Sequence, residues 1–152
     1  MGSRRRFNYT MMGDTVNLAA RSESGAKSYG VYTMITSETK ALSQSFKDDI
    51  TFRFLDRIVV KGRSQPVEMY ELVGFDTEVS DEVRECLSLH KRGIELYLAQ
   101  DWDGAKALFE RSAKREIHQD SNPSLIMIKR CDALKNEPPP TNWDGVYVMK
   151  TK

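Results

Sequence analysis

The sequence YTMMGDTVNLAAR, residues 9–21, places an amide and a guanidinium at helical spacing. Asn17 and Arg21 are four residues apart, so on a helix they lie one turn apart on the same face. The guanidinium is a planar, permanently charged group suited to phosphate, and the amide can hydrogen-bond a hydroxyl or ring oxygen without adding charge. The pair therefore suits a phosphorylated sugar. The same spacing also fits two solvated surface residues, so taken alone it leaves the function open.

A strand and a helix are predicted to position this pair. Residues 7–12, FNYTMM, have the aromatic and apolar composition of a strand. Asp14 or Thr15 is a suitable N-cap for the helix that follows. That helix is expected to run to about Ser28 and to stop near Gly30, because glycine commonly ends helices.

Another strand and helix come next. Residues 31–36, VYTMIT, are β-branched and aromatic, which predicts a short strand. Ser37 followed by the acidic Glu38 is typical of a capped helix start, and the helix is expected over residues 37–46.

Two further strands are predicted to form a hairpin. Residues 51–60 alternate apolar and polar side chains, and residues 66–73 return as a second strand after a Lys61-Gly62-Arg63 turn. The apolar side chains of the first strand that are expected to share one face are Phe52, Phe54 and Ile58. The first 73 residues thus follow the order β-α-β-α-β-β, an α+β pattern.

The composition changes after residue 73. Residues 74–80 are polar and acidic and predict a linker, and residues 81–152 predict a helical extension with a proline-rich end. The predicted helices are residues 81–99, residues 105–118 with Ala105, Leu108, Phe109 and Ser112 inward, and residues 124–135 capped by Asn122-Pro123. The prolines at 138–140 and the Asn-Trp-Asp-Gly segment exclude a helix there.

The extension also resembles a tetratricopeptide helix pair. Gly93, Ala105 and Phe109 have the spacing of the small and aromatic residues in such a unit. One unit cannot bury its own apolar face, so it must pack on something. We expect it to dock on the α+β part, and the alternative is a groove for a partner peptide.

Composition excludes several classes of function. The net charge of +1 and a single basic run, Arg4 to Arg6, argue against nucleic-acid binding. Cys86 and Cys131 have no metal-ligand spacing and fit reduced thiols. No apolar run approaches the ~20 residues that cross a bilayer, and no signal peptide follows Met1. A soluble, cytoplasmic protein is expected.

The order of the motifs makes the pattern specific. YTMMGDTVNLAAR, then YGVYTMIT, then FRFLDRIVVKGRSQPVEMYEL resembles the C-terminal half of the catalytic domain of class III nucleotide cyclases. This resemblance covers about residues 2–73 and implies a partial ferredoxin-like cyclase domain. The tail, with its DWDGA, NPS, RC, PPP and NWDG elements, resembles the extension that follows that domain in some bacterial members.

The resemblance implies roles for four residues. Arg21 would stabilise charge on the α-phosphate as the ribose 3′-hydroxyl attacks it, and Asn17 would orient the ribose. Lys61, in VKGR, matches the lysine that holds the triphosphate, although a solvated turn lysine would look the same. Thr10 stands where the family reads the purine, and a threonine there resembles the adenine-specific members. ATP is therefore favoured over GTP, while a hydroxyl alone does not settle the base.

The sequence also departs from the family pattern. Ser22-Glu23 replaces the usual Leu-Glu after the arginine. The two aspartates that hold Mg²⁺ or Mn²⁺ in the family, and its adenine-reading lysine, have no counterpart in this sequence. The family site is shared between two subunits, so the resemblance implies that this chain supplies one half of it and that the metal ligands come from a second cyclase subunit or an N-terminal half. An unpaired sheet edge would favour a homodimer or a strand-exchanged dimer.

Two functions therefore remain from the sequence. In the first, the chain is part of an adenylate cyclase and is inactive alone. In the second, it is a non-catalytic interaction module derived from a cyclase that binds a partner through the helical tail. A P-loop nucleotide binder is excluded because the sequence lacks GxxxxGK[ST].

Overall fold

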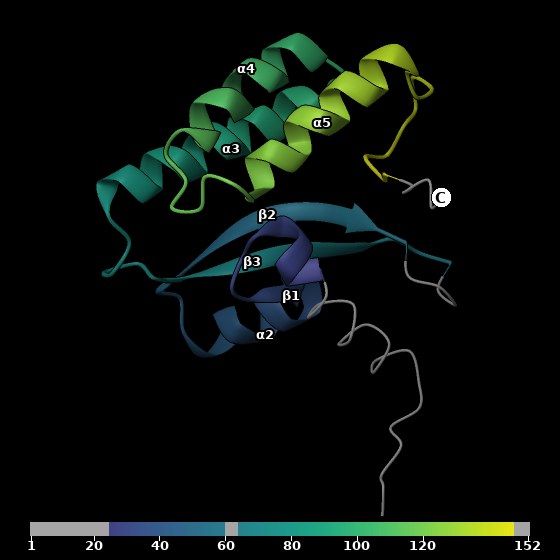
Figure 1. Ribbon diagram of the computed structural model, residues 1–152. Helices are drawn as coiled ribbons and strands as arrows, with labels where there is room; N and C mark the ends of the chain where they lie inside the picture. Colours follow the sequence, from purple (N-terminus) through teal and green to yellow (C-terminus); the bar gives the residue numbers. More distant parts are fainter. Residues whose placement is uncertain (1–24, 60–63, 148–152) are drawn as a thin grey trace, which may run out of the picture.

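The computed structural model describes residues 25–59 and 64–147, which form a small antiparallel sheet with helices packed on it (Figure 1). The strands are β1 (Met34–Thr36), β2 (Ile50–Ile58) and β3 (Val67–Phe75), in the order β1-β3-β2. The architecture is mixed α and β, as the sequence predicted. The strand expected at residues 7–12 lies outside the described residues.

The β2–β3 hairpin is confirmed. Its pairing runs from Ile50 opposite Phe75 to Ile58 opposite Val67. The register shifts between Phe54 and Asp56, which is a bulge, and the consecutive side chains of Leu55 and Asp56 are both buried. The bulge breaks the simple alternation. Phe54 therefore packs toward the helical tail, whereas Ile58 packs on the other core cluster, and the prediction that they share a face is wrong.

Helix α2 (Ser37–Phe46) has the predicted bounds, but its cap is one residue earlier. The Thr36 hydroxyl accepts a hydrogen bond from the Thr39 amide at 3.2 Å. The strand before it is shorter than predicted and begins at Met34, not at residue 31. The reason is that the Val31 amide bonds back to the Ala26 carbonyl at 3.0 Å and completes the preceding helix end.

Three further helices form the tail: α3 (Asp81–Leu98), α4 (Trp102–Ala113) and α5 (Pro123–Asn136). Side chains of Ser80, Asp101 and Asn122 cap their first turns. Helix α4 begins at Trp102, earlier than predicted, because Asp101 accepts from the Gly104 amide and so includes the expected turn in the helix. It ends at Ala113 because the amides that follow Lys114, those of Arg115 and Glu116, bond three residues back.

The tail packs internally through Gly93 and Phe109. Ala105, Leu108, Phe109 and Ser112 are buried on α4, as predicted. A Cβ atom at position 93 would lie 2.7 Å from the Phe109 ring, so only glycine lets α3 and α4 approach this closely. Membership of this helix pair in the tetratricopeptide class stays a prediction.

The tail is docked on the sheet, as expected. Figure 1 shows α3, α4 and α5 together above β2, with α2 on the opposite side. His90 of α3 contacts the Phe54 carbonyl of β2 at 3.1 Å, and Ile126 of α5 packs on the core cluster that contains Leu55 and Met69. Within the described ranges, none of the helices is both long and apolar enough to cross a membrane.

Candidate functional site

The four predicted site residues, Thr10, Asn17, Arg21 and Lys61, lie outside the described residues. The structure describes what flanks them. Residues 25–29 are helical and begin four positions after Arg21. The paired ends of β2 and β3, Ile58 and Val67, bracket the segment that carries Lys61.

The helix over residues 25–29 ends where the sequence predicts. Gly30 has a φ of +65°, a left-handed conformation that glycine adopts without strain. A Cβ atom there would also lie 2.1 Å from the Ser121 carbonyl oxygen, so the loop before α5 presses directly on this helix end. Nearby, the Tyr32 ring meets the His118 ring edge-on at 5.4 Å between centroids.

A buried ionic cluster lies beside the same helix end. Arg130 of α5 donates to both carboxylate oxygens of Asp56, at 2.8 and 2.7 Å, and to the Tyr29 hydroxyl oxygen at 2.8 Å. The Tyr29 hydroxyl in turn donates to Asp56. Burial raises the pKa of Tyr29 above its ordinary value, so the hydroxyl keeps its proton and remains a donor. We call Tyr29, Asp56 and Arg130 the clamp.

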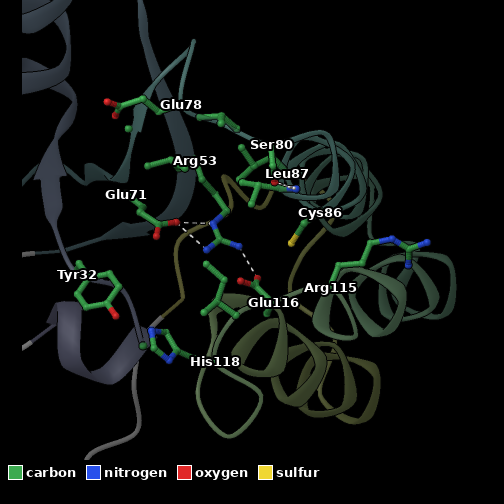
Figure 2. A pocket seen from close by; sticks show the side chains of 16 residues that line it. Tyr32, Arg53, Glu71, Glu78, Ser80, Cys86, Leu87, Arg115, Glu116 and His118 are labelled. Atoms are coloured by element: carbon green, nitrogen blue, oxygen red, sulfur yellow. Dashed lines mark hydrogen bonds and ion pairs between the residues drawn. The ribbon is translucent and has the colours of Figure 1, made fainter.

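A second buried ionic cluster joins the sheet to the end of α4. Figure 2 shows the Arg53 guanidinium between the carboxylates of Glu71 and Glu116. Arg53 Nε lies 2.7 Å and Nη2 2.6 Å from Glu71 Oε2, and Nη1 donates to Glu116. Burial raises the pKa of Glu71, and the adjacent Arg53 opposes that shift. A cavity of about 380 Å³ opens beside this cluster.

This cavity does not suit a triphosphate. Its most buried cation, Arg53, already has two carboxylate partners, and Arg115 pairs with Glu85 at 2.9 Å. Cys86 lines the same cavity, but burial raises the pKa of its thiol, which disfavours the reactive thiolate. The arrangement binds the tail to the sheet and offers no evident chemistry of its own.

Sequence reasoning missed both ionic clusters. Arg53 and Asp56 lie in the strand segment TFRFLDRIVV, for which only an alternation of apolar and polar side chains was predicted. The available signal was a charged residue next to apolar ones, because Arg53 lies between Phe52 and Phe54 and Asp56 follows Leu55. Their partners, Arg130 and Glu116, lie 74 and 63 residues further along the chain, so spacing could not reveal the pairs.

The residues that the structure describes do not fit a divalent metal. Among residues 25–59 and 64–147, histidine, cysteine and carboxylate side chains nowhere gather in a group of three able to hold an ion. Asp56, Glu71 and Glu116 are each already bound to an arginine.

Comparison with known proteins gives the family. The model of the adenylate and guanylate cyclase catalytic domain matches residues 1–74. These residues belong to the class III cyclase family. All four predicted site residues fall within the match, and so do β1, α2 and most of the β2–β3 hairpin.

Several curated relatives are adenylate cyclases. The terminal-differentiation specific adenylate cyclase of Dictyostelium discoideum is 31% identical over 132 residues, which is 86% of this chain and 6% of that protein. Adenylate cyclase 1 of Rhizobium meliloti is 40% identical over 74 residues, 49% of this chain and 11% of that protein. An adenylate cyclase of Anabaena cylindrica is 34% identical over 73 residues, 47% of this chain and 14% of that protein. No solved structure gives a significant match.

The coverage of the cyclase relatives is uneven. The chain spans between 6% and 14% of the length of each of these proteins. The Dictyostelium match, 132 residues long, exceeds the 74 residues of the family match by 58, so that likeness extends into the helical tail.

Proposed function

We propose that this chain supplies the transition-state half of an adenylate cyclase site, which converts ATP to 3′,5′-cyclic AMP and pyrophosphate. The observation that carries the proposal is the family match over residues 1–74, a range that spans Thr10, Asn17, Arg21 and Lys61. The adenylate cyclase names of the relatives favour ATP over GTP.

Catalysis of this reaction depends more on correctly placed charged groups than on covalent chemistry. The ribose 3′-hydroxyl gives up its proton to solvent as its oxygen forms a bond to the α-phosphorus, and the bond from that phosphorus to the pyrophosphate oxygen breaks, so that pyrophosphate leaves. Arg21 stabilises the negative charge that grows on the α-phosphate, and Asn17 holds the ribose so that its hydroxyl is aligned. Lys61 binds the triphosphate tail, and Thr10 contacts the adenine.

The metal-binding half of this site is proposed to come from elsewhere. Mg²⁺ or Mn²⁺, when bound, supplies activation of the hydroxyl and neutralisation of the pyrophosphate charge. The family's two metal-binding aspartates have no counterpart in this sequence, so a second cyclase subunit or an N-terminal half would provide them. The chain alone is therefore expected to be inactive and to act as part of a dimer. We also propose that it works in the cytoplasm.

The division of the chain belongs to the same proposal. Residues 1–73 form the C-terminal portion of the catalytic domain, residues 74–80 link it to the tail, and residues 81–152 form the helical extension. The alternative, a non-catalytic module that binds a partner through the tail, is less favoured. Several inward side chains of α3, α4 and α5 pack on one another and on β2, which leaves them unavailable to a partner.

Mixing the chain with a cyclase subunit tests the proposal. The added subunit keeps its metal-binding aspartates but lacks its own transition-state arginine. We expect the mixture to form cyclic AMP from MnATP, and Arg21→Ala in this chain to reduce the rate at least ~100-fold, since one aimed donor is worth about 3 kcal/mol. The matched control is Arg92→Ala, an exposed arginine on α3, which should leave the rate unchanged. Failure of the wild-type chain to restore synthesis would refute the proposal.

A further inference from the structure

The helix end that follows Asn17 and Arg21 is held from two sides by the tail. On one side, the Ser121 carbonyl of the loop before α5 sits where a side chain at position 30 would be. On the other side, Arg130 of α5 reaches the Tyr29 hydroxyl and Asp56. Tail and helix end are separated by up to 101 residues of sequence, so this contact is a product of the fold alone.

The clamp is buried, and each of its three side chains is hydrogen-bonded within it. The exposed fractions of Tyr29, Asp56 and Arg130 are 6%, 3% and 6%. Both Asp56 oxygens accept from Arg130, and Oδ1 also accepts from the Arg57 amide at 2.8 Å. The Tyr147 ring covers the guanidinium, with its centroid 4.3 Å from Arg130 Cζ. Bidentate pairs in such surroundings have one geometry, because any displacement leaves a buried charge without its partner.

We propose that Arg130 is a positioning residue for catalysis, which through Asp56 and Tyr29 fixes the end of the helix predicted to carry Asn17 and Arg21. This inference rests on the proposed function and extends it, because it makes the helical tail a working part of the cyclase site. Arg130 touches no substrate. It acts by fixing the position of the helix end in space. A displacement of about 1 Å at the reacting groups can lower the rate ~100-fold.

Tyr29→Phe is the sharpest variant. It removes the hydroxyl that links the helix end to the clamp and leaves the two Arg130–Asp56 hydrogen bonds in place. The matched control is Tyr70→Phe, which removes another tyrosine hydroxyl bonded to a carboxylate, that of Glu68 at 2.9 Å on the same strand. Arg130→Lys is a second variant, since lysine keeps the charge but cannot form the bidentate pair.

Two measurements on these variants of the full chain test the positioning role of Arg130. In the cyclic AMP assay with the metal-competent subunit, Tyr29→Phe and Arg130→Lys are expected to lower kcat about tenfold with KM for MnATP within twofold, because orientation in the transition state is lost while binding is kept. In amide hydrogen exchange, which needs no activity, both variants are expected to speed exchange in peptides covering residues 16–29. Tyr70→Phe should change neither.

The outcomes separate this inference from the proposed function. Unchanged exchange over residues 16–29 in both variants overturns the positioning role. Unchanged kcat in an active mixture overturns it as well, as does a rise in KM at constant kcat. If the wild-type chain restores no synthesis, the proposed function fails, and faster exchange in the two variants still supports control of the helix end by Arg130.

Discussion

At the residue scale, the described site is dominated by charges that have been removed from water and given fixed partners. Arg53 and Arg130 each lie between groups from distant parts of the chain, and each is nearly buried. Such pairs add little net stability compared with apolar residues of the same size, but losing one partner is costly. Their main effect is therefore to fix the relative positions of the elements that they join. The buried His90 ring likewise joins separate elements, because it bridges α3 to β2 and α5.

Protonation of His90 should weaken the fold. Its Nε2 donates to the Phe54 carbonyl and its Nδ1 contacts the Ser124 hydroxyl at 3.2 Å. Burial lowers its pKa to about 3, from 6.5 in an unfolded chain. The contribution of neutral His90 to the unfolding free energy is therefore present above pH 6.5. It is lost as the pH falls toward 3, by about 1.4 kcal/mol per pH unit.

Urea unfolding at pH 6.5 and pH 5 measures this effect. Between these values His90 should account for about 2 kcal/mol of lost unfolding free energy, and His90→Gln should remove that part of the loss. The control is His118→Gln, since His118 is exposed. Equal pH dependence in the wild type and in His90→Gln would contradict the assignment.

At the scale of elements, close packing of α3 against α4 should make Gly93 irreplaceable. Gly93→Ala gains about 1 kcal/mol of helix propensity, but its Cβ would lie 2.7 Å from the Phe109 ring. We expect a net loss of about 1–3 kcal/mol in unfolding free energy, because overpacking forces the ring to move. Arg92→Ala, one position earlier and exposed, should stay within about 0.5 kcal/mol of the wild type. An unchanged or higher melting temperature for Gly93→Ala would contradict this packing.

The elements were largely predictable because their signals are local. The end of the helix at Gly30, the bounds of α2, the β2–β3 hairpin and the inward face of α4 all follow from caps, turns and periodicity. The bulge at Leu55 was not predictable, because it depends on the partner strand and on the burial of Asp56. The clamp was equally hidden, since its members are brought together only by the docking of the tail. The residues inferred from the family resemblance stay predictions, because they lie outside the described ranges.

At the scale of the whole molecule, the tail and the sheet should behave as one folding unit. Arg53→Met would leave the carboxylates of Glu71 and Glu116 buried without their cation. We expect a loss of about 3–5 kcal/mol in unfolding free energy. The triple variant that also changes both glutamates to glutamine should recover part of it. Both are measured by denaturant unfolding followed by circular dichroism.

The matched control lies on the same strand. Arg57 pairs with Asp144 at 3.7 Å in a half-exposed position, so Arg57→Met should cost less than about 1 kcal/mol. Similar losses for Arg53→Met and Arg57→Met would show that the tail is not held by the buried cluster. Two separate unfolding transitions in the wild type would show that the tail and the sheet fold independently.

The most direct test of the central claim is cyclic AMP formation from MnATP by the purified chain, first alone and then with the arginine-deficient, metal-competent cyclase subunit. The account predicts no synthesis by the chain alone and restored synthesis in the mixture that disappears with Arg21→Ala. Synthesis by the chain alone at the rate of the mixture would contradict the shared site, and a mixture that stays inactive would contradict the role of Asn17 and Arg21.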